Sequence, residues 1–358
     1  MKIKRILGVL LSTILVTSSM VVPTMAANYD DTNTKFEYSL KPGMEEWGQL
    51  NHGERVLASQ IPNDVLKNMT TNELLTAVLD YPCFVDMIFY DTYQDGYEVV
   101  RDNFNGLQEL LGREDSGEYL LDTYKNIELA QILTISDEDT KFNESLQMLY
   151  LETILAQPEV TETLSTESLE EVEKIVKENY EMQLANKDDT LSLSYSGYYE
   201  SLADQQDIEL YDYGTTVSTP NGSSVNVIVR TGTDYAYNNR TAIKNSIEHN
   251  YPGASVVGNA TIKYNCHAYA WAHRTNVWMN NPSKYWTDGS YSLEASNSPT
   301  DVGQKVYYPG SGKEHSGNVI SLSGNTIRSK WGEQSLVEHS VGNCPYFFIP
   351  LSVKFYGR

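Results

Sequence analysis

One cysteine of this chain has neighbours that favour a reactive thiol, and one downstream histidine is placed to act on it. Cys266 follows Asn265, a residue type that often caps a helix, so we expect the cysteine in the first helical turn. The unpaired N–H groups and the positive dipole end of that turn stabilise a thiolate. His315 opens a later segment in which apolar residues alternate. A thiolate beside an imidazole is the minimum apparatus for nucleophilic catalysis.

The two side chains would have complementary roles. His315 is expected to act as general base toward the Cys266 thiol and then as general acid toward a leaving amine. The N–H groups at the helix start can also donate to an oxyanion. Apolar spacing predicts a helix that packs on a sheet and runs through Ala268, Trp271, Ala272, Thr275 and Met279. The alternatives are an inert buried cysteine and a surface histidine at the end of a strand.

Other residues with ligand chemistry give weaker patterns. His267 and His273 are six residues apart on one expected helix, so they point in different directions. The sequence has no His-Glu-x-x-His, Cys-x-x-Cys or carboxylate-rich loop, which argues against zinc and calcium. His339 with Cys344 is a further ligand pair, although His339 more simply packs near the cleft or faces solvent. We therefore expect no metal and no cofactor.

The chain has only three cysteines, Cys83, Cys266 and Cys344. An odd number leaves at least one thiol unpaired in an exported protein. A disulfide between Cys83 and Cys344 would join the two halves of the chain. The other interpretation is that Cys83 is a small buried apolar residue.

The N-terminus and the charge distribution bear on where the protein works. Residues 1–26 begin with positive charge, continue with an apolar run and end in small residues, as a secretory signal does. The run is short for a membrane span, so we expect a secreted protein with no membrane attachment after cleavage, by Gram-positive-type export. The net charge is −22, with −29 in residues 27–214 and +4 in residues 215–358. An acidic protein is repelled by nucleic acid and by an anionic cell wall.

Residue periodicity predicts an α+β chain. An acidic helical domain is expected over residues 27–186, a linker over 187–222 and a second domain over 223–358. Thr70 and Glu73 form a capping box, and helices are expected near 95–112, 117–130, 138–156 and 167–184. In the second domain we expect a helix near 239–249 and strands over 225–229, 302–308, 315–322 and 326–331.

The C-terminal domain resembles the papain-like cysteine peptidases and amidases of bacterial cell walls, of the NlpC and CHAP types. The resemblance covers roughly residues 225–350 and implies a Cys-bearing helix packed on an antiparallel sheet, with Cys266 as nucleophile and His315 as base. Gln304 stands where these families usually have Asp. The motifs that carry the resemblance are Asn265-Cys266-His267-Ala268-Tyr269-Ala270-Trp271, Val302-Gly303-Gln304-Lys305-Val306-Tyr307-Tyr308 and His315-Ser316-Gly317-Asn318-Val319.

These families carry a polar residue that orients the histidine on the strand after it. Here a three-residue turn over 323–325 would put Ser329 and Trp331 on the sheet face of His315, so Ser329 is the candidate for this role. A two-residue turn would substitute Lys330, and a bend in the strand would bring in Glu333. No His, Asn or Glu falls at the usual place.

The sequence thus predicts a secreted cysteine hydrolase that cleaves an amide or peptide bond in cell-wall peptide or an extracellular polypeptide. The rival interpretation is an extracellular binding or structural protein on a degenerate papain-like domain. The N-terminal domain resembles a helical module of exported Firmicute proteins, carried by Tyr81-Pro82-Cys83-Phe84-Val85-Asp86-Met87 and Phe104-Asn105-Gly106-Leu107-Gln108-Glu109-Leu110-Leu111. Its acidity beside a mildly basic domain suggests that it docks over the cleft, as a latency domain or a partner platform.

Overall fold

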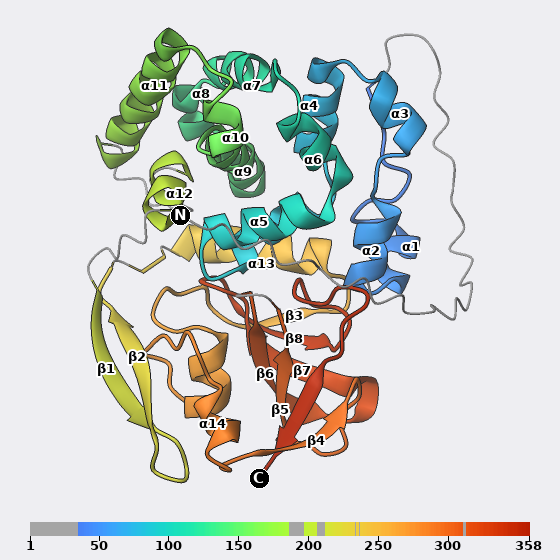
Figure 1. Ribbon diagram of the computed structural model, residues 1–358, viewed down its shortest axis with the longest axis vertical. Helices are drawn as coiled ribbons and strands as arrows, with labels where there is room; N and C mark the ends of the chain where they lie inside the picture. The colour runs from blue at the N-terminus through green and yellow to red at the C-terminus, as the bar shows by residue number, and fades with distance from the viewer. Residues whose placement is uncertain (1–34, 186–196, 206–211, 233, 236, 311–312) are drawn as a thin grey trace, which may run out of the picture.

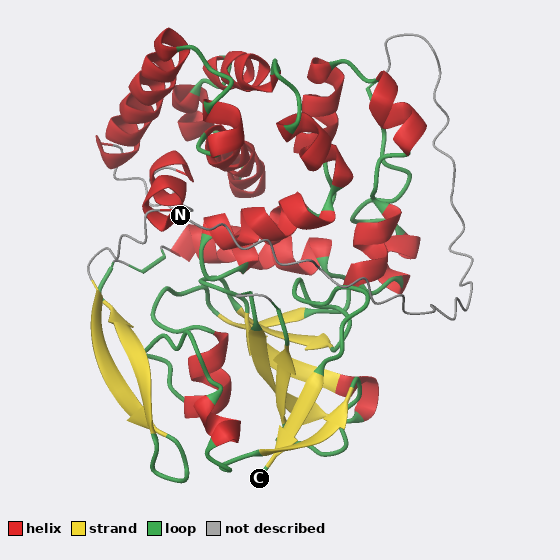
Figure 2. Cartoon of the chain, viewed as in Figure 1, coloured by secondary structure: helices red, strands yellow, loops and turns green. Residues whose placement is uncertain are grey.

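The computed structural model describes residues 35–185, 197–205, 212–232, 234–235, 237–310 and 313–358. The predicted secretory signal, residues 1–26, lies outside this part of the chain. A helical region comes first and a mainly antiparallel sheet domain follows, so the α+β prediction is confirmed (Figure 1). Figure 2 shows the helical region above the sheet domain, in which strands are accompanied by a few helices. Within the described residues, no helix combines the length and the apolar character needed to cross a bilayer.

The helical region consists of short helices around two longer ones. The capping box predicted at Thr70 and Glu73 is present, and it starts α4. The two segments expected as single helices near 95–112 and 117–130 are each divided, because buried Phe104 adopts an extended backbone and Asn126 ends α7. The elements are α1 (Glu45–Gln49), α2 (His52–Ala58), α3 (Asn63–Asn68), α4 (Thr71–Leu79), η1 (Phe84–Phe89), α5 (Tyr93–Asn103), α6 (Asn105–Leu111), α7 (Ser116–Lys125), α8 (Leu129–Thr134), α9 (Glu138–Leu155), α10 (Pro158–Thr161) and α11 (Thr166–Ala185).

The segment expected as a linker, 187–222, contains regular structure where it is described. Helix α12 (Gly197–Gln205) packs against α9 and buries Tyr198 and Ser201. Strand β1 (Asp212–Ser218) pairs with β2 (Ser224–Arg230) in an antiparallel hairpin. The linker prediction is therefore wrong for these residues. These residues form a helix and a strand because they pack against α9 and pair with β2, although their Ser-, Gly- and Tyr-rich sequence has no periodic apolar pattern.

The sheet domain is built on seven antiparallel strands in the order β3-β8-β7-β6-β5-β9-β4. The expected strands 302–308, 315–322 and 326–331 appear as β5, β6 and β7, joined between β6 and β7 by the short helical turn η4 (Ser323–Asn325). The strands are β3 (Ser255–Gly258), β4 (Ser292–Ser296), β5 (Lys305–Tyr308), β6 (His315–Ser321), β7 (Thr326–Lys330), β8 (Leu336–Ser340) and β9 (Lys354–Gly357), with helices α13 (Tyr237–Asn250), η3 (Ala268–Ala272) and α14 (Lys284–Thr287) around them.

Each face of the sheet packs into a different hydrophobic core. One core is continuous from the helical region, through α13, to sheet residues such as Val319, Ile327 and Trp331. The second lies on the other face, between β2, η3, α14 and Tyr356. Because the first core contains side chains from both regions, burying it requires the helical region and the sheet domain together.

Hydrogen bonds also connect the helical region to the sheet domain. Backbone and side-chain hydrogen bonds cross this boundary from Trp47 Nε1 to Asn250 O at 2.8 Å and from Tyr90 Oη to Pro345 O at 2.8 Å. The Arg55 guanidinium also donates to Asn343 Oδ1 at 2.8 Å. The two regions are therefore joined by specific buried contacts as well as by apolar packing.

Candidate active site

Cys266 begins a short helical segment, as expected from Asn265. The Asn265 side-chain oxygen accepts from the backbone N–H of Ala268 at 3.2 Å and of Met279 at 3.1 Å, so it caps the segment and holds the returning chain. The helix does not run on to Met279, however. It is a π-helix that ends at Ala272, because His273 adopts a left-handed backbone conformation. The predicted continuous helix is wrong.

The Cys266 thiol is buried, with 1% of the residue exposed. Burial raises the pKa of the thiol well above its usual value, and the nearby Asp91 carboxylate raises it further. Hydrogen bonds to the sulfur from the backbone N–H groups of Ser316 and His267 lower it, as does Lys330. The thiol is therefore protonated in this closed arrangement, although its surroundings contain the donors that a thiolate requires.

Asp91 reaches this site from the helical region. Its Oδ2 accepts a hydrogen bond from Asn265 Nδ2 at 2.8 Å, while its Oδ1 has no partner among the described residues. Burial raises the pKa of Asp91 to about 6, against opposing effects of Asn265 and Lys330. Residues 89–92, from the last residue of η1 to the residue before α5, thus bring a carboxyl group to the start of the Cys266 helix.

The same segment packs closely on the sheet domain. A Cβ atom added to Gly332 would lie 1.9 Å from the Tyr90 carbonyl oxygen, so only glycine permits this approach. Tyr346 Oη donates to Phe89 O at 2.6 Å, and the rings of Phe89 and Trp331 meet edge to face. Residues 89–92 therefore pack on the sheet domain beside the Cys266 site through backbone as well as side-chain contacts.

Lys330, at the end of β7, is a buried cation beside Cys266. Its Nζ donates to Thr261 O at 3.0 Å and to Gly332 O at 2.7 Å, and it lies over the ring of Tyr264. Burial lowers the pKa of Lys330 to about 7. Lys330 can therefore gain or lose a proton around neutral pH, which adds or removes a positive charge near the thiol.

His315 lies at the start of β6, on the sheet face that packs against the helical region. Strand alternation puts it on the same face as Val319, whereas Ser316 points to η3 and accepts from Trp271 Nε1 at 2.8 Å. The His315 ring stacks on Tyr346 with centroids 3.9 Å apart, and neither ring nitrogen has a hydrogen-bond partner among the described residues. Burial lowers the pKa of His315. No hydrogen bond joins it to the Cys266 thiol.

Ser329 occupies the predicted sheet face but contacts a different histidine. The register pairs it with Gly317, two residues after His315, so it lies on the predicted face. A three-residue turn alone would have paired it with Val319; the four-residue connection after Ser321 and a register shift in β6 move the pairing by two residues. Its Oγ lies 2.7 Å from His339 Nε2 and accepts from Trp331 Nε1 at 3.1 Å. Ser329 therefore does not orient His315 here. His339 is buried in this cluster and does not face solvent.

Gln304, which stands where the resembling families have Asp, has a structural role. Its side chain accepts from the backbone N–H groups of Thr300 and Asp301 and donates to Glu294. It helps to line a hollow of about 590 Å³ on the sheet domain with His273 and Lys305, away from Cys266. The three cysteines are all free and buried, so Cys83 and Cys344 form no disulfide.

The sequence carries no signal for Asp91 as a member of the site, and it suggests Lys330 only as an alternative to Ser329. Asp91 is 175 residues from Cys266 in the chain, and no local pattern links them. Comparison of the chain with protein-family models, with curated proteins and with solved structures gives no significant match.

Proposed function

We propose that this protein is a secreted cysteine hydrolase that cleaves an amide or peptide bond in cell-wall peptide or in an extracellular polypeptide. The observation that supports it best is the position of Cys266, at a capped helix start with its sulfur accepting from the N–H groups of His267 and Ser316. His315 immediately precedes Ser316 on β6. The proposed nucleophile and base thus belong to two elements that meet at Ser316.

In this proposal, the structure is a closed form of the enzyme, in which substrate cannot reach Cys266. Cys266 and His315 are both buried, and burial keeps both in their neutral states. Residues 89–92 would have to move for a substrate to reach the sulfur. The helical region would therefore act as a latency domain, through a short segment rather than through its acidic surface as a whole.

Catalysis would then start from a neutral Cys266 thiol and a neutral His315 imidazole. Opening would also have to turn the His315 ring from Tyr346 toward the sulfur. His315 would then take the proton of the Cys266 thiol as the sulfur attacks the carbonyl carbon, and backbone N–H groups beside the sulfur would donate to the oxyanion. The imidazolium returns the proton to the leaving amine as the carbon–nitrogen bond breaks. Water, deprotonated by His315, hydrolyses the thioester and restores the thiol.

Incubation of the purified protein with peptidoglycan and with a peptide library tests this function. The wild-type chain and Cys83→Ala should release new amino termini, whereas Cys266→Ala and His315→Ala should not. Cys83 is the matched control because it is also a free buried cysteine. Equal release by wild type and Cys266→Ala would sink the proposal.

One observation favours a non-catalytic binding protein as the second candidate. The His315 ring makes no hydrogen bond within the described residues and faces a cluster other than Cys266. Under this candidate the sheet domain binds an extracellular ligand without turnover. Retention of a wall or peptide ligand by both wild type and Cys266→Ala, with no product from either, would support it.

A further inference from the structure

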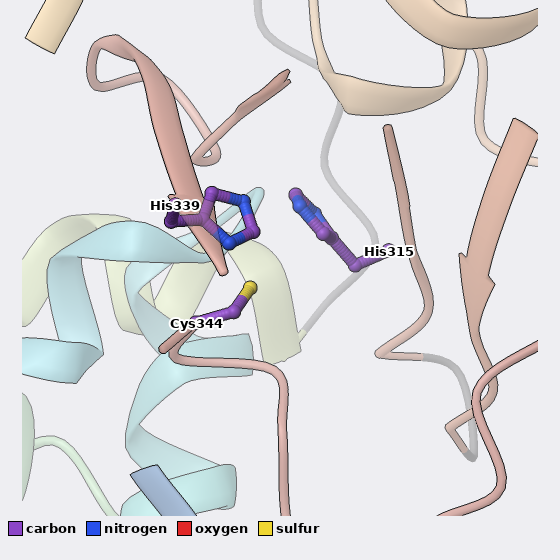
Figure 3. Close-up of side chains that lie close together, drawn as sticks. All are labelled: His315, His339 and Cys344. Carbon is purple, nitrogen blue, oxygen red and sulfur yellow. The ribbon is translucent and has the colours of Figure 1, made fainter. Parts of the chain in front are cut away.

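His315, His339 and Cys344 form a cluster of metal-ligating side chains in the shared core. Their ligand atoms lie within 4.8 Å of one another, and all three residues are fully or almost fully buried. Figure 3 shows the three side chains converging from separate segments of the sheet domain. His315 opens β6, His339 belongs to β8, and Cys344 follows β8.

Two observations indicate that this cluster is suited to a ligand. Both ring nitrogens of His315 are buried without a hydrogen-bond partner among the described residues, which is costly for an imidazole that can accept and donate. His339 Nδ1 lies 2.8 Å from the carbonyl oxygen of Ser340. Because a carbonyl can only accept, Nδ1 carries the proton and Nε2 keeps its lone pair. Metal-binding histidines are commonly held in this way by a backbone carbonyl.

We propose that His315, His339 and Cys344 form a binding site for a zinc-class divalent transition metal ion. Two imidazole nitrogens and one thiolate match the ligand preference of Zn²⁺ and exclude Ca²⁺ and Mg²⁺, which take oxygen ligands. Three protein ligands leave one position of a tetrahedral ion for water. Ligand atoms in such a site lie roughly 3.3–3.8 Å apart, so closing the cluster requires shifts of no more than about 1.5 Å.

Binding of the metal ion releases one proton, that of the Cys344 thiol. Burial raises the pKa of the Cys344 thiol, so the thiol is protonated without metal, and Zn²⁺ would displace that proton to solvent as the sulfur–zinc bond forms. The Ser329 hydroxyl, now 2.7 Å from His339 Nε2, would turn away to free that lone pair. Since the ligands are buried, we expect the ion to enter during folding or slow opening of the core.

The site has a consequence that rests on the proposed function. His315 cannot bind a metal ion through its available lone pair and also take the proton of Cys266. The metal-loaded protein would therefore be inactive, and removal of the metal would restore hydrolysis. Metal binding does not depend on the proposed hydrolase function, because Cys266 is not a ligand.

Cobalt provides the test, since Co²⁺ replaces Zn²⁺ and reports a thiolate ligand through a charge-transfer band. Co²⁺ is added to the native full chain and during refolding, and one equivalent should give the charge-transfer band and the visible bands of tetrahedral cobalt. Zn²⁺ should abolish both. Cys344→Ser should lose the charge-transfer band, and His339→Gln should weaken binding by at least about tenfold. Circular dichroism verifies that each variant is folded.

Cys83→Ser and Cys266→Ala are the matched controls, and both should keep the spectrum of the wild type. The Cys266→Ala result separates the two proposals, because this variant has no nucleophile but retains the metal site. Absence of the charge-transfer band from wild-type protein under both loading conditions would overturn the metal site, even if the variants do not fold. Loss of the band in Cys266→Ala, or its persistence in folded Cys344→Ser, would also overturn it.

Discussion

Asp91 of the helical region accepts a hydrogen bond at 2.8 Å from the side chain of Asn265, the residue that caps the Cys266 helix. The interaction connects a segment between η1 and α5 directly to the candidate nucleophile. It brings a carboxylate that opposes ionisation of the thiol, and it belongs to the segment that packs on the sheet domain beside the site. Asp91 is therefore the residue through which the helical region would most directly control Cys266.

Replacing Asp91 by Asn should increase the reactivity of Cys266. Asn keeps an oxygen that accepts from Asn265 but has no negative charge, so the pKa of the thiol should fall. Because the pKa of Asp91 is about 6, the effect should be small at pH 5 and larger at pH 8. Each unit of decrease in the thiol pKa would raise the thiolate fraction about tenfold. The measurement is the iodoacetamide labelling rate of the Cys266 peptide by mass spectrometry.

Cys83 and Cys344 serve as internal references in the same digests, and Asp122→Asn repeats the charge change at an exposed position of α7. An equal increase at pH 5 and pH 8, or an increase at all three cysteines, would indicate general loosening and contradict the electrostatic explanation.

Gly332→Ala should weaken the junction between the two regions. Gly332 has a positive φ of 47°, and its added Cβ would meet the Tyr90 carbonyl oxygen. Gly222 also has a positive φ, of 88°, but no atom near an added Cβ, so Gly222→Ala is the control. Gly332→Ala should lose at least about 2 kcal/mol more unfolding free energy than the control. Chemical denaturation measures both, and equal losses would contradict the close approach.

Lys330→Met should change how stability depends on pH. Burial depresses the pKa of Lys330 to about 7 from 10.5, so between these values the unfolded chain binds a proton that the folded chain does not. The contribution of Lys330 is therefore fully present above pH 10.5, decreases as pH falls from 10.5, and is lost once pH has fallen through about 7. Relative to Lys330→Met, wild type should gain up to about 1.4 kcal/mol per pH unit from pH 7 to 10.

Exposed Lys284→Met is the control for this series, and its unfolding free energy should follow that of wild type at every pH. Parallel pH profiles for wild type and Lys330→Met would mean that Lys330 keeps an ordinary pKa in the folded protein.

Ser316→Ala should destabilise the contact between β6 and η3. The Ser316 hydroxyl is the acceptor for Trp271 Nε1 and lies 2.8 Å from His267 Nδ1, and all three residues are buried. Its removal leaves these groups without their partner, which should cost about 1–3 kcal/mol of unfolding free energy. Exposed Ser292→Ala on β4 should be nearly neutral. A neutral Ser316→Ala would show that water replaces the hydroxyl.

Local patterns in the sequence were enough to predict part of this fold. The capping box at Thr70, the helices α9 and α11, and the strands β6 and β7 follow from short-range signals that the structure retains. The hairpin of β1 and β2 was missed on one side, because pairing with β2 rather than periodicity makes residues 212–218 a strand. The helix at Cys266 was predicted too long, because the left-handed turn at His273 has no sequence signal comparable to Gly or Pro.

The candidate site was predictable only in its local parts. Asn265 caps the Cys266 helix, and Ser329 lies on the predicted His315 face, although its register differs by two residues from that of a three-residue turn. The contacts that affect the chemistry of Cys266 and His315 are long-range. Asp91 comes from the helical region, and Ser329 forms its hydrogen bond with His339 and not with His315. Periodicity can assign a residue to a face, but it cannot choose between two histidines on neighbouring strands.

Trapping of an acyl-enzyme is the most direct test of Cys266 as the nucleophile. Wild-type protein is mixed with the peptide library or peptidoglycan fragments, quenched in acid and analysed by mass spectrometry for a hydroxylamine-sensitive thioester. We expect an added acyl mass on the Cys266 peptide, with none on the peptides that contain Cys83 or Cys344. Hydrolysis without an adduct on Cys266, or an adduct on Cys344 instead, would contradict it.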